Sequence, residues 1–210
     1  MKSNVQKCLA VGFLIGAGFA ASASAVNSLA VNGPGLNGTN FKLEVTLTAS
    51  SNNVYVETTH PTDESHYLAR FWVGRGTINF PANNSIRIGA LADDAFGQRI
   101  ILFLKKNPNN TIHLNTWHLL DSGPFVFGCS IFVTGSAGTA SKQFELEYTQ
   151  SNGSNNGSIK LTRLDTNLVC NLTGLDMDNF QVDSGRFGLL SGSGVNATGT
   201  YIFDEFESYR

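Results

Sequence analysis

The chain is poor in charge and in the residues that build helical proteins. Only 14% of its 210 residues are Asp, Glu, Lys or Arg, and 14 basic against 16 acidic side chains give a formal net charge of −2. A protein without a basic surplus lacks the field that holds nucleic acid or anionic lipid, so neither is expected as a partner. Glycine (22) and phenylalanine (15) are plentiful instead. This composition argues against an all-α protein and favours many short strands joined by turns.

Long apolar runs are absent after residue 20, and the first 25 residues predict a leader. A basic start precedes the apolar run Cys8–Ala20, and small residues follow up to an Ala-x-Ala site that ends at Ala25. This is the pattern of a secretory signal peptide. We therefore expect residues 1–25 to be a signal peptide and residues 26–210 to be one domain without a membrane span. The mature protein would be periplasmic or extracellular.

Cysteine is scarce, and beyond that leader only Cys129 and Cys170 remain. An even number of cysteines in an exported chain suggests a disulfide. Such a bond would close a loop of roughly 40 residues and stabilise the fold by about 4 kcal/mol. Both cysteines also lie in apolar, strand-like segments, so two buried thiols are the alternative.

Helical patterns are missing as well, and alternating segments fill the chain from residue 54 onward. In the segment Gln143–Thr149, Phe144, Leu146 and Tyr148 would face a core while the residues between them would face water, as in a half-exposed antiparallel strand. The Asn- and Gly-rich stretch after it predicts a hairpin turn to Ser158–Leu164.

About a dozen such segments predict an all-β fold, a two-sheet antiparallel β-sandwich, and residues 31–40 would only lead into it. The expected strands are 54–59, 67–73, 86–88, 99–105, 111–119, 125–133, 143–149, 158–164, 168–172, 185–190 and 200–206.

Six segments of the chain follow one another in an informative order. They are His60–Phe71, Phe144–Tyr148, the Asn-Gly turn into Gly157–Leu161, Leu172–Asn179, Arg186–Gly192 and Gly199–Arg210. In this order they resemble the concanavalin A-like, laminin G-like jelly-roll domain of exported, mostly uncharacterised bacterial proteins. The resemblance implies a jelly-roll sandwich of the lectin and glucanase type, and it informs the fold more than the function.

The sequence also lacks recognisable catalytic motifs. The resemblance makes a glucanase the natural catalytic hypothesis, but the alternation Glu-x-Asp-x-x-Glu that places two carboxylates in similar glucanases is missing. The nearest pair is Glu145 and Glu147, which would share one face of a strand, and a solvated strand face is the simpler interpretation. His113 and His118 are five residues apart, so in a strand they would lie on opposite faces and would not share a metal. We therefore expect no enzymatic activity.

Exposed aromatic side chains are what a sugar-binding sandwich needs, because sugar rings stack on them. Trp72 and Trp117 are the candidates, and packing in the core is the alternative for each. Asp176, Asp178 and Asn179 offer hard oxygen ligands to a structural calcium ion, or else form a turn whose side chains bond the local backbone. No other cofactor is expected.

The sequence as a whole predicts an exported, non-catalytic, lectin-like domain that binds a polysaccharide or glycoconjugate. The alternative is a structural or protein-interaction sandwich with a protein partner and no sugar ligand. A glycoside hydrolase of the glucanase type is the third hypothesis.

Overall fold

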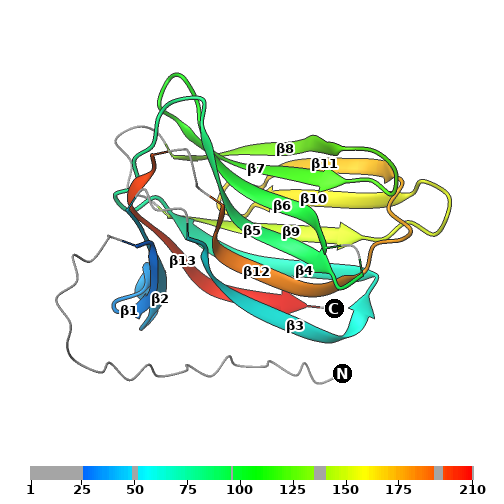
Figure 1. The fold of residues 1–210 in the computed structure, drawn as a ribbon, viewed down its shortest axis with the longest axis horizontal. Coiled ribbons are helices and arrows are strands. Elements are labelled where there is room, and N and C mark those ends of the chain that lie inside the picture. The colour runs from blue at the N-terminus through cyan, green and yellow to red at the C-terminus, as the bar shows by residue number, and fades with distance from the viewer. Residues whose placement is uncertain (1–25, 49–51, 96, 135–140, 192–195, 210) are drawn as a thin grey trace.

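The computed structural model describes residues 26–48, 52–95, 97–134, 141–191 and 196–209 (Figure 1). Within these residues every regular element is a strand except one 3-10 turn, η1. The elements are β1 (Ser28–Asn32), η1 (Leu36–Gly38), β2 (Lys42–Thr48), β3 (Val54–Glu64), β4 (His66–Gly74), β5 (Ser85–Asp93), β6 (Gly97–Lys106), β7 (Ile112–Leu119), β8 (Phe125–Thr134), β9 (Ser141–Thr149), β10 (Gly157–Arg163), β11 (Leu168–Leu175), β12 (Val182–Ser191) and β13 (Thr198–Tyr209).

The strands form two antiparallel sheets that are stacked face to face (Figure 1). The seven-stranded sheet has the order β1-β2-β13-β4-β9-β10-β11, and the six-stranded sheet has the order β3-β12-β5-β6-β7-β8. The last strand, β13, lies between β2 and β4, so the two ends of the domain meet inside one sheet. The predicted all-β, two-sheet sandwich is confirmed. No helix in the described residues is long and apolar enough to cross a membrane.

Alternation along the strands places the core between the sheets. In β9, Phe144, Leu146 and Tyr148 are fully buried, as the sequence predicts, while the residues between them face outward. Phe71 of β4 is also fully buried, and its ring lies 5.4 Å from that of Phe187 on β12 in the other sheet. Contacts of this kind hold the two sheets together, because burial of apolar surface is the main favourable term in folding.

The pair β1 and β2 is not predicted by the sequence patterns. Residues 31–40, expected only to lead into the fold, contain the end of β1 and the η1 turn. The carboxylate of Asp204 holds this turn, because its Oδ2 accepts hydrogen bonds from the Leu36 N–H and the Thr39 hydroxyl, both at 2.6 Å. Asp204 lies on β13, so the contact that fixes this turn comes from the far end of the chain.

A disulfide joins Cys129 on β8 to Cys170 on β11, with their Cα atoms 5.7 Å apart. β8 and β11 are the edge strands of the six-stranded and seven-stranded sheets. The bond therefore closes one side of the sandwich, and the alternative of two buried thiols is wrong. The predicted signal peptide, residues 1–25, lies outside the described residues and stays a prediction.

Removal of this disulfide is expected to lower the free energy of unfolding by about 4 kcal/mol, because it frees a loop of roughly 40 residues in the unfolded chain. Denaturant unfolding of the double variant Cys129→Ala/Cys170→Ala, followed by circular dichroism, measures the loss. The matched control is reductant, which should destabilise the wild type to the same extent and leave the double variant unchanged. A double variant as stable as the oxidised wild type would contradict the prediction.

Candidate functional site

Aromatic side chains gather on the outer face of the six-stranded sheet. Trp117 of β7 is 38% exposed, and its ring meets Phe103 of β6 and Phe127 of β8 edge-on, with centroids 6.3 and 6.2 Å apart. Trp117 is thus a surface residue, and packing in the core is wrong for it. Trp72 lies on the outer face of the other sheet, where its indole N–H donates to Glu205 Oε2 at 2.8 Å. The two tryptophans proposed from the sequence lie on opposite faces and cannot build one site.

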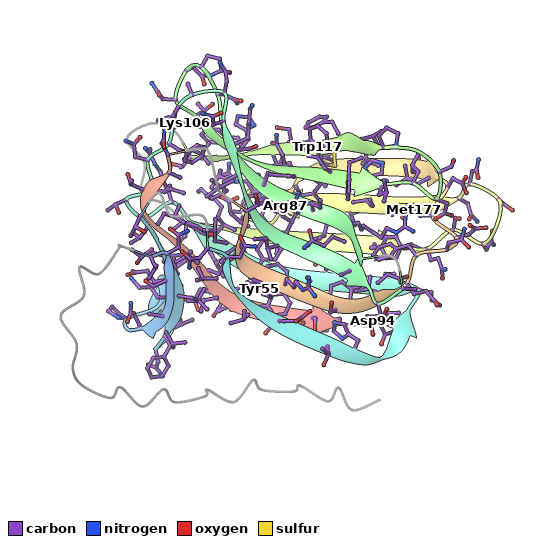
Figure 2. All side chains as sticks on the ribbon, viewed as in Figure 1. Tyr55, Arg87, Asp94, Lys106, Trp117 and Met177 are labelled. Carbon is purple, nitrogen blue, oxygen red and sulfur yellow. A yellow bond between two sulfur atoms is a disulfide. The ribbon has the colours of Figure 1, made fainter. Side chains whose placement is uncertain are left out.

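A shallow pocket of about 340 Å³ opens beside Trp117, and Figure 2 shows Trp117 and Arg87 over this sheet. Its lining is mostly aromatic and aliphatic, with one cation, and consists of Ser85, Arg87, Ile101, Phe103, Trp117 and Phe125. The cation comes from β5, which pairs with β6 so that Arg87 lies opposite Phe103.

Arg87 is a guanidinium without a carboxylate partner in the described part of the chain. Its Nη1 donates to Gln98 Oε1 at 2.9 Å, and its Cζ lies 5.6 Å from the Phe103 ring centroid. Its Nε is buried and makes no hydrogen bond. Partial burial lowers the pKa of Arg87, although an arginine stays charged in any ordinary buffer. The pocket therefore presents an unneutralised positive charge next to aromatic rings.

A β-bulge sets which side chains of β8 reach this face. Asn115 pairs with Ser130 and Trp117 pairs with Phe127, so Gly128 and Cys129 together lie opposite the single residue between them on β7. The hydroxyl of that residue, Thr116, accepts the Cys129 N–H at 2.7 Å. Ser130 and Phe127 are three residues apart and would point to opposite faces of a regular strand. The extra residue brings both to the outer face and turns Cys129 toward its disulfide partner.

Gly128 is required at this bulge. A Cβ atom added there would lie 2.5 Å from Thr116 Oγ1, well inside van der Waals contact. Only a residue without a side chain lets the threonine hydroxyl reach the backbone of β8.

A chain of polar side chains runs beside the pocket on the same face. Ser130 Oγ donates to Asn115 Oδ1 at 2.8 Å, and His113 Nδ1 lies 3.1 Å from the same Ser130 oxygen. The edge of the Phe132 ring contacts the imidazole, with centroids 5.8 Å apart. Partial burial lowers the pKa of His113 below its ordinary value. A neutral imidazole here is a potential general base. As predicted, His118 lies on the opposite, inner face, where it is 4% exposed.

Carboxylates on the opposite sheet are already engaged. Glu145 Oε2 lies 2.6 Å from Arg70 Nε, and Glu147 contacts both His66 Nε2 (3.2 Å) and Lys160 Nζ (3.1 Å). The hydrogen bond from His66 is the main cause of the lowered pKa of Glu147. Glu145 and Glu147 do share a face, as predicted, but they form cross-strand ion pairs and neither is placed as a free acid or nucleophile.

The loop predicted to bind calcium, which contains Asp176 and Asp178, lies close to a third aspartate from another segment. Asp121, from the segment between β7 and β8, has a carboxylate oxygen within 4.8 Å of one on Asp176 and one on Asp178. Its Oδ2 accepts the backbone N–H groups of Asp178 (2.7 Å) and Asn179 (3.2 Å), while its Oδ1 is buried without a hydrogen-bond partner. We call Asp121, Asp176 and Asp178 the acidic cluster. Sequence reasoning missed Asp121 because 55 residues separate it from Asp176.

Comparisons with known proteins identify a fold rather than a family. No family model matches the chain, and no curated protein matches it. A fungal structure, endo-β-1,4-glucuronan lyase from Trichoderma reesei, is similar with a TM-score of 0.61 at 11% identity, over 88% of this chain and 87% of that one. Alginate lyase A1-II′, of polysaccharide lyase family 7, gives a TM-score of 0.48 at 10% identity, over 90% and 81% of the two chains.

A third similar structure is a receptor-binding domain of botulinum neurotoxin mosaic serotype C/D. Its TM-score is 0.52 at 12% identity, over 90% of this chain and 43% of that one. At such identities the likenesses show the jelly-roll sandwich alone, and this agrees with the fold that the sequence resemblance implies.

The comparisons correct two predictions from the sequence. The chain was expected to be non-catalytic, either lectin-like or a structural and protein-interaction sandwich, and not to be an enzyme. The similarity to endo-β-1,4-glucuronan lyase contradicts both expectations, because a protein named as a polysaccharide lyase has this same fold. The sequence argument failed because it searched for the acidic motif of glucanases. A lyase does not need that pair of carboxylates.

Calcium at the acidic cluster stays a prediction. The contact of its carboxyl group with the Asp121 carboxylate is the main cause of the raised pKa of Asp178, and the nearby charges of Asp121 and Asp176 add to it. Because a divalent cation would offset this repulsion, Ca²⁺ should raise the melting temperature of the wild type, and EDTA should reverse the rise. Asp176→Asn should weaken the response, whereas Asp165→Asn, a matched change outside the acidic cluster, should preserve it. Equal melting curves with Ca²⁺ and with EDTA would count against the site.

Proposed function

We propose that this protein is a polysaccharide lyase that binds an acidic, uronate-containing polysaccharide on the outer face of its six-stranded sheet. The observation that carries the proposal is Arg87, a guanidinium with no carboxylate partner among the described residues, in a pocket beside Trp117. The similarity in fold to a glucuronan lyase supports the choice of reaction class. The substrate side of the proposal rests on charge and on ring stacking.

Charge favours an anionic ligand on this face. Arg87, Lys105 and Arg186 are cations of its strands β5, β6 and β12, and Glu57 on β3 lies 2.7 Å from Arg186. Arg186 is thus paired with Glu57. Arg87 is the cation among the residues that line the pocket. A uronate carboxylate could form a charge-assisted, two-point contact with such a guanidinium.

Aromatic rings supply the second part of the recognition. Trp117 and Phe127 are 38% and 53% exposed, so their rings can stack on the apolar faces of successive sugars. The proposal therefore retains the polysaccharide partner that the sequence predicts. Of the two candidate tryptophans, it places only Trp117 in the binding site. Trp72 serves instead as a hydrogen-bond donor to Glu205 on the other sheet.

The chemistry that fits these groups is β-elimination. A base removes the proton from C5 of a uronate, the C4–O4 bond breaks, a C4=C5 double bond forms, and the leaving oxygen takes up a proton. Arg87 would neutralise the uronate carboxylate and thereby make the C5 proton more acidic. His113, whose pKa is lowered by burial, would be the base, because it is neutral at a pH where a free histidine is partly protonated.

Arg87→Ala is expected to lower kcat/KM on acidic polysaccharides by about a hundredfold, because it removes the charge that stabilises the transition state. The assay measures the ultraviolet absorbance of the unsaturated uronate product with glucuronan, alginate and other uronate polymers as substrates. Trp117→Ala should mainly raise KM, since a stacking contact is made before and during the reaction.

Two matched variants on the opposite sheet serve as controls for this experiment. Arg70→Ala and Trp72→Ala make the same chemical changes away from the pocket and should leave kcat/KM near the wild-type value. The proposal fails if no uronate polymer yields unsaturated product, or if Arg70→Ala and Arg87→Ala reduce activity equally.

A further inference from the structure

A hydrogen-bond chain of three side chains determines which nitrogen of His113 carries the proton. Asn115 is 8% exposed, and its carbonyl oxygen accepts the Ser130 hydroxyl at 2.8 Å. A hydroxyl has one proton to donate. Because Ser130 gives that proton to Asn115, its oxygen can only accept from His113 Nδ1, which lies 3.1 Å away.

We infer that Asn115 and Ser130 are positioning residues that hold the imidazole proton of His113 on Nδ1 and leave Nε2 as the free acceptor. A neutral imidazole has one donor and one acceptor nitrogen, so fixing the first fixes the second. The consequence for catalysis rests on the proposed function, because a base must present its unprotonated nitrogen to the substrate. The tautomer itself does not depend on it.

The packing around the chain keeps its members in place. The β-bulge at Gly128 brings Ser130 opposite Asn115, and His113 lies two residues earlier on the same face of β7. Phe132 pairs with His113 across the strands and contacts it edge-on. The guanidinium of Arg163 lies 5.7 Å from the Phe132 ring centroid and donates to the Phe132 carbonyl at 3.0 Å.

Among the described residues, one unpaired cation and one ion pair lie near His113. Lys105 of β6 lies directly opposite His113, and Arg163 of β10, beyond Phe132, is paired with Asp165 at 2.6 Å. Neither stabilises a protonated imidazole, and the hydrogen bond that the structure gives to the imidazole is the one to Ser130. The pH limb that reports deprotonation of His113 should therefore lie below the ordinary histidine value of about 6.5.

Nitrogen-15 NMR of the imidazole rings tests the inference directly, because Nδ1–H and Nε2–H tautomers have different ring-nitrogen shifts. The wild type should show His113 as the Nδ1–H form at a pH above its pKa. Ser130→Ala and Asn115→Leu should both increase the Nε2–H form. His118, on the inner face of the same strand, is the internal reference and should stay unchanged.

Asn115→Asp is the conservative variant that separates positioning from packing. A carboxylate also accepts the Ser130 hydroxyl, so the Nδ1–H form should persist while the added negative charge raises the pKa of His113 by about one unit. On an accepted substrate, the acid limb of the kcat/KM profile should move up with that pKa. Asn115→Leu should instead lower kcat about a hundredfold with little change in KM.

Two results would overturn the inference. In the first, the wild-type proton is on Nε2, which would mean that the chain runs in reverse with the Asn115 amide nitrogen as donor. In the second, the Nδ1–H form is unchanged in both Ser130→Ala and Asn115→Leu.

The NMR and activity results can fail separately. The expected tautomers without cleavage of any polymer would support the inference and overturn the proposed function. Cleavage that depends on Arg87, with the wild-type proton on Nε2, would support the proposed function and overturn the inference.

Discussion

The two-residue period of an extended chain is the constraint on which both the core and the candidate site depend. Each strand sends alternate side chains inward and outward, so the sequence that fills the space between the sheets also decides what the outer faces carry. On β9 this alternation buries Phe144, Leu146 and Tyr148 and points Glu145 and Glu147, which lie between them, outward. On β7 the same period puts Leu114 in the core and points His113, Asn115 and Trp117 toward the outer face, where Asn115 is covered by its neighbours.

The site also depends on departures from that period, and the one on β8 sets its polar side chains. On β8 the bulge at Gly128 and Cys129 adds a residue, so the alternation shifts by one and both Phe127 and Ser130 face outward. Cys129 can then point inward to its disulfide while Ser130 points outward to Asn115. The disulfide and the polar chain are consequences of the same local irregularity. Such bulges re-aim side chains in many proteins with binding sites on sheets.

Much of the fold is predictable from the sequence, and less of the site is. The alternation in Gln143–Thr149 and its hairpin partner predicts β9 and β10 correctly, because both are local patterns. The pair β1 and β2 was missed, since the turn between them is held by Asp204 from the far end of the chain.

The residues of the pocket come from separate strands, and no local motif unites them. Arg87 and Trp117 are 30 residues apart in sequence, and they meet only because β5, β6 and β7 are neighbours in one sheet. The sequence did identify Trp117 as a candidate. It could not show that Arg87 has no carboxylate partner among the described residues, or that Asp121 joins Asp176 and Asp178, because both facts depend on contacts between distant segments.

The outer faces of the two sheets differ in whether their charged side chains are paired, so the two sides of the molecule have different electrostatic properties. On the seven-stranded sheet, cross-strand ion pairs such as Arg70 with Glu145 neutralise each other. On the six-stranded sheet, Arg87 has no such partner among the described residues. Near a dense polyanion such as a hydrated gel, the electrostatic field of the polyanion would orient the protein before any contact forms. The outer face of the six-stranded sheet, with its aromatic side chains, would then point toward the polyanion. Added salt would weaken that alignment and slow capture while leaving the geometry of the pocket unchanged.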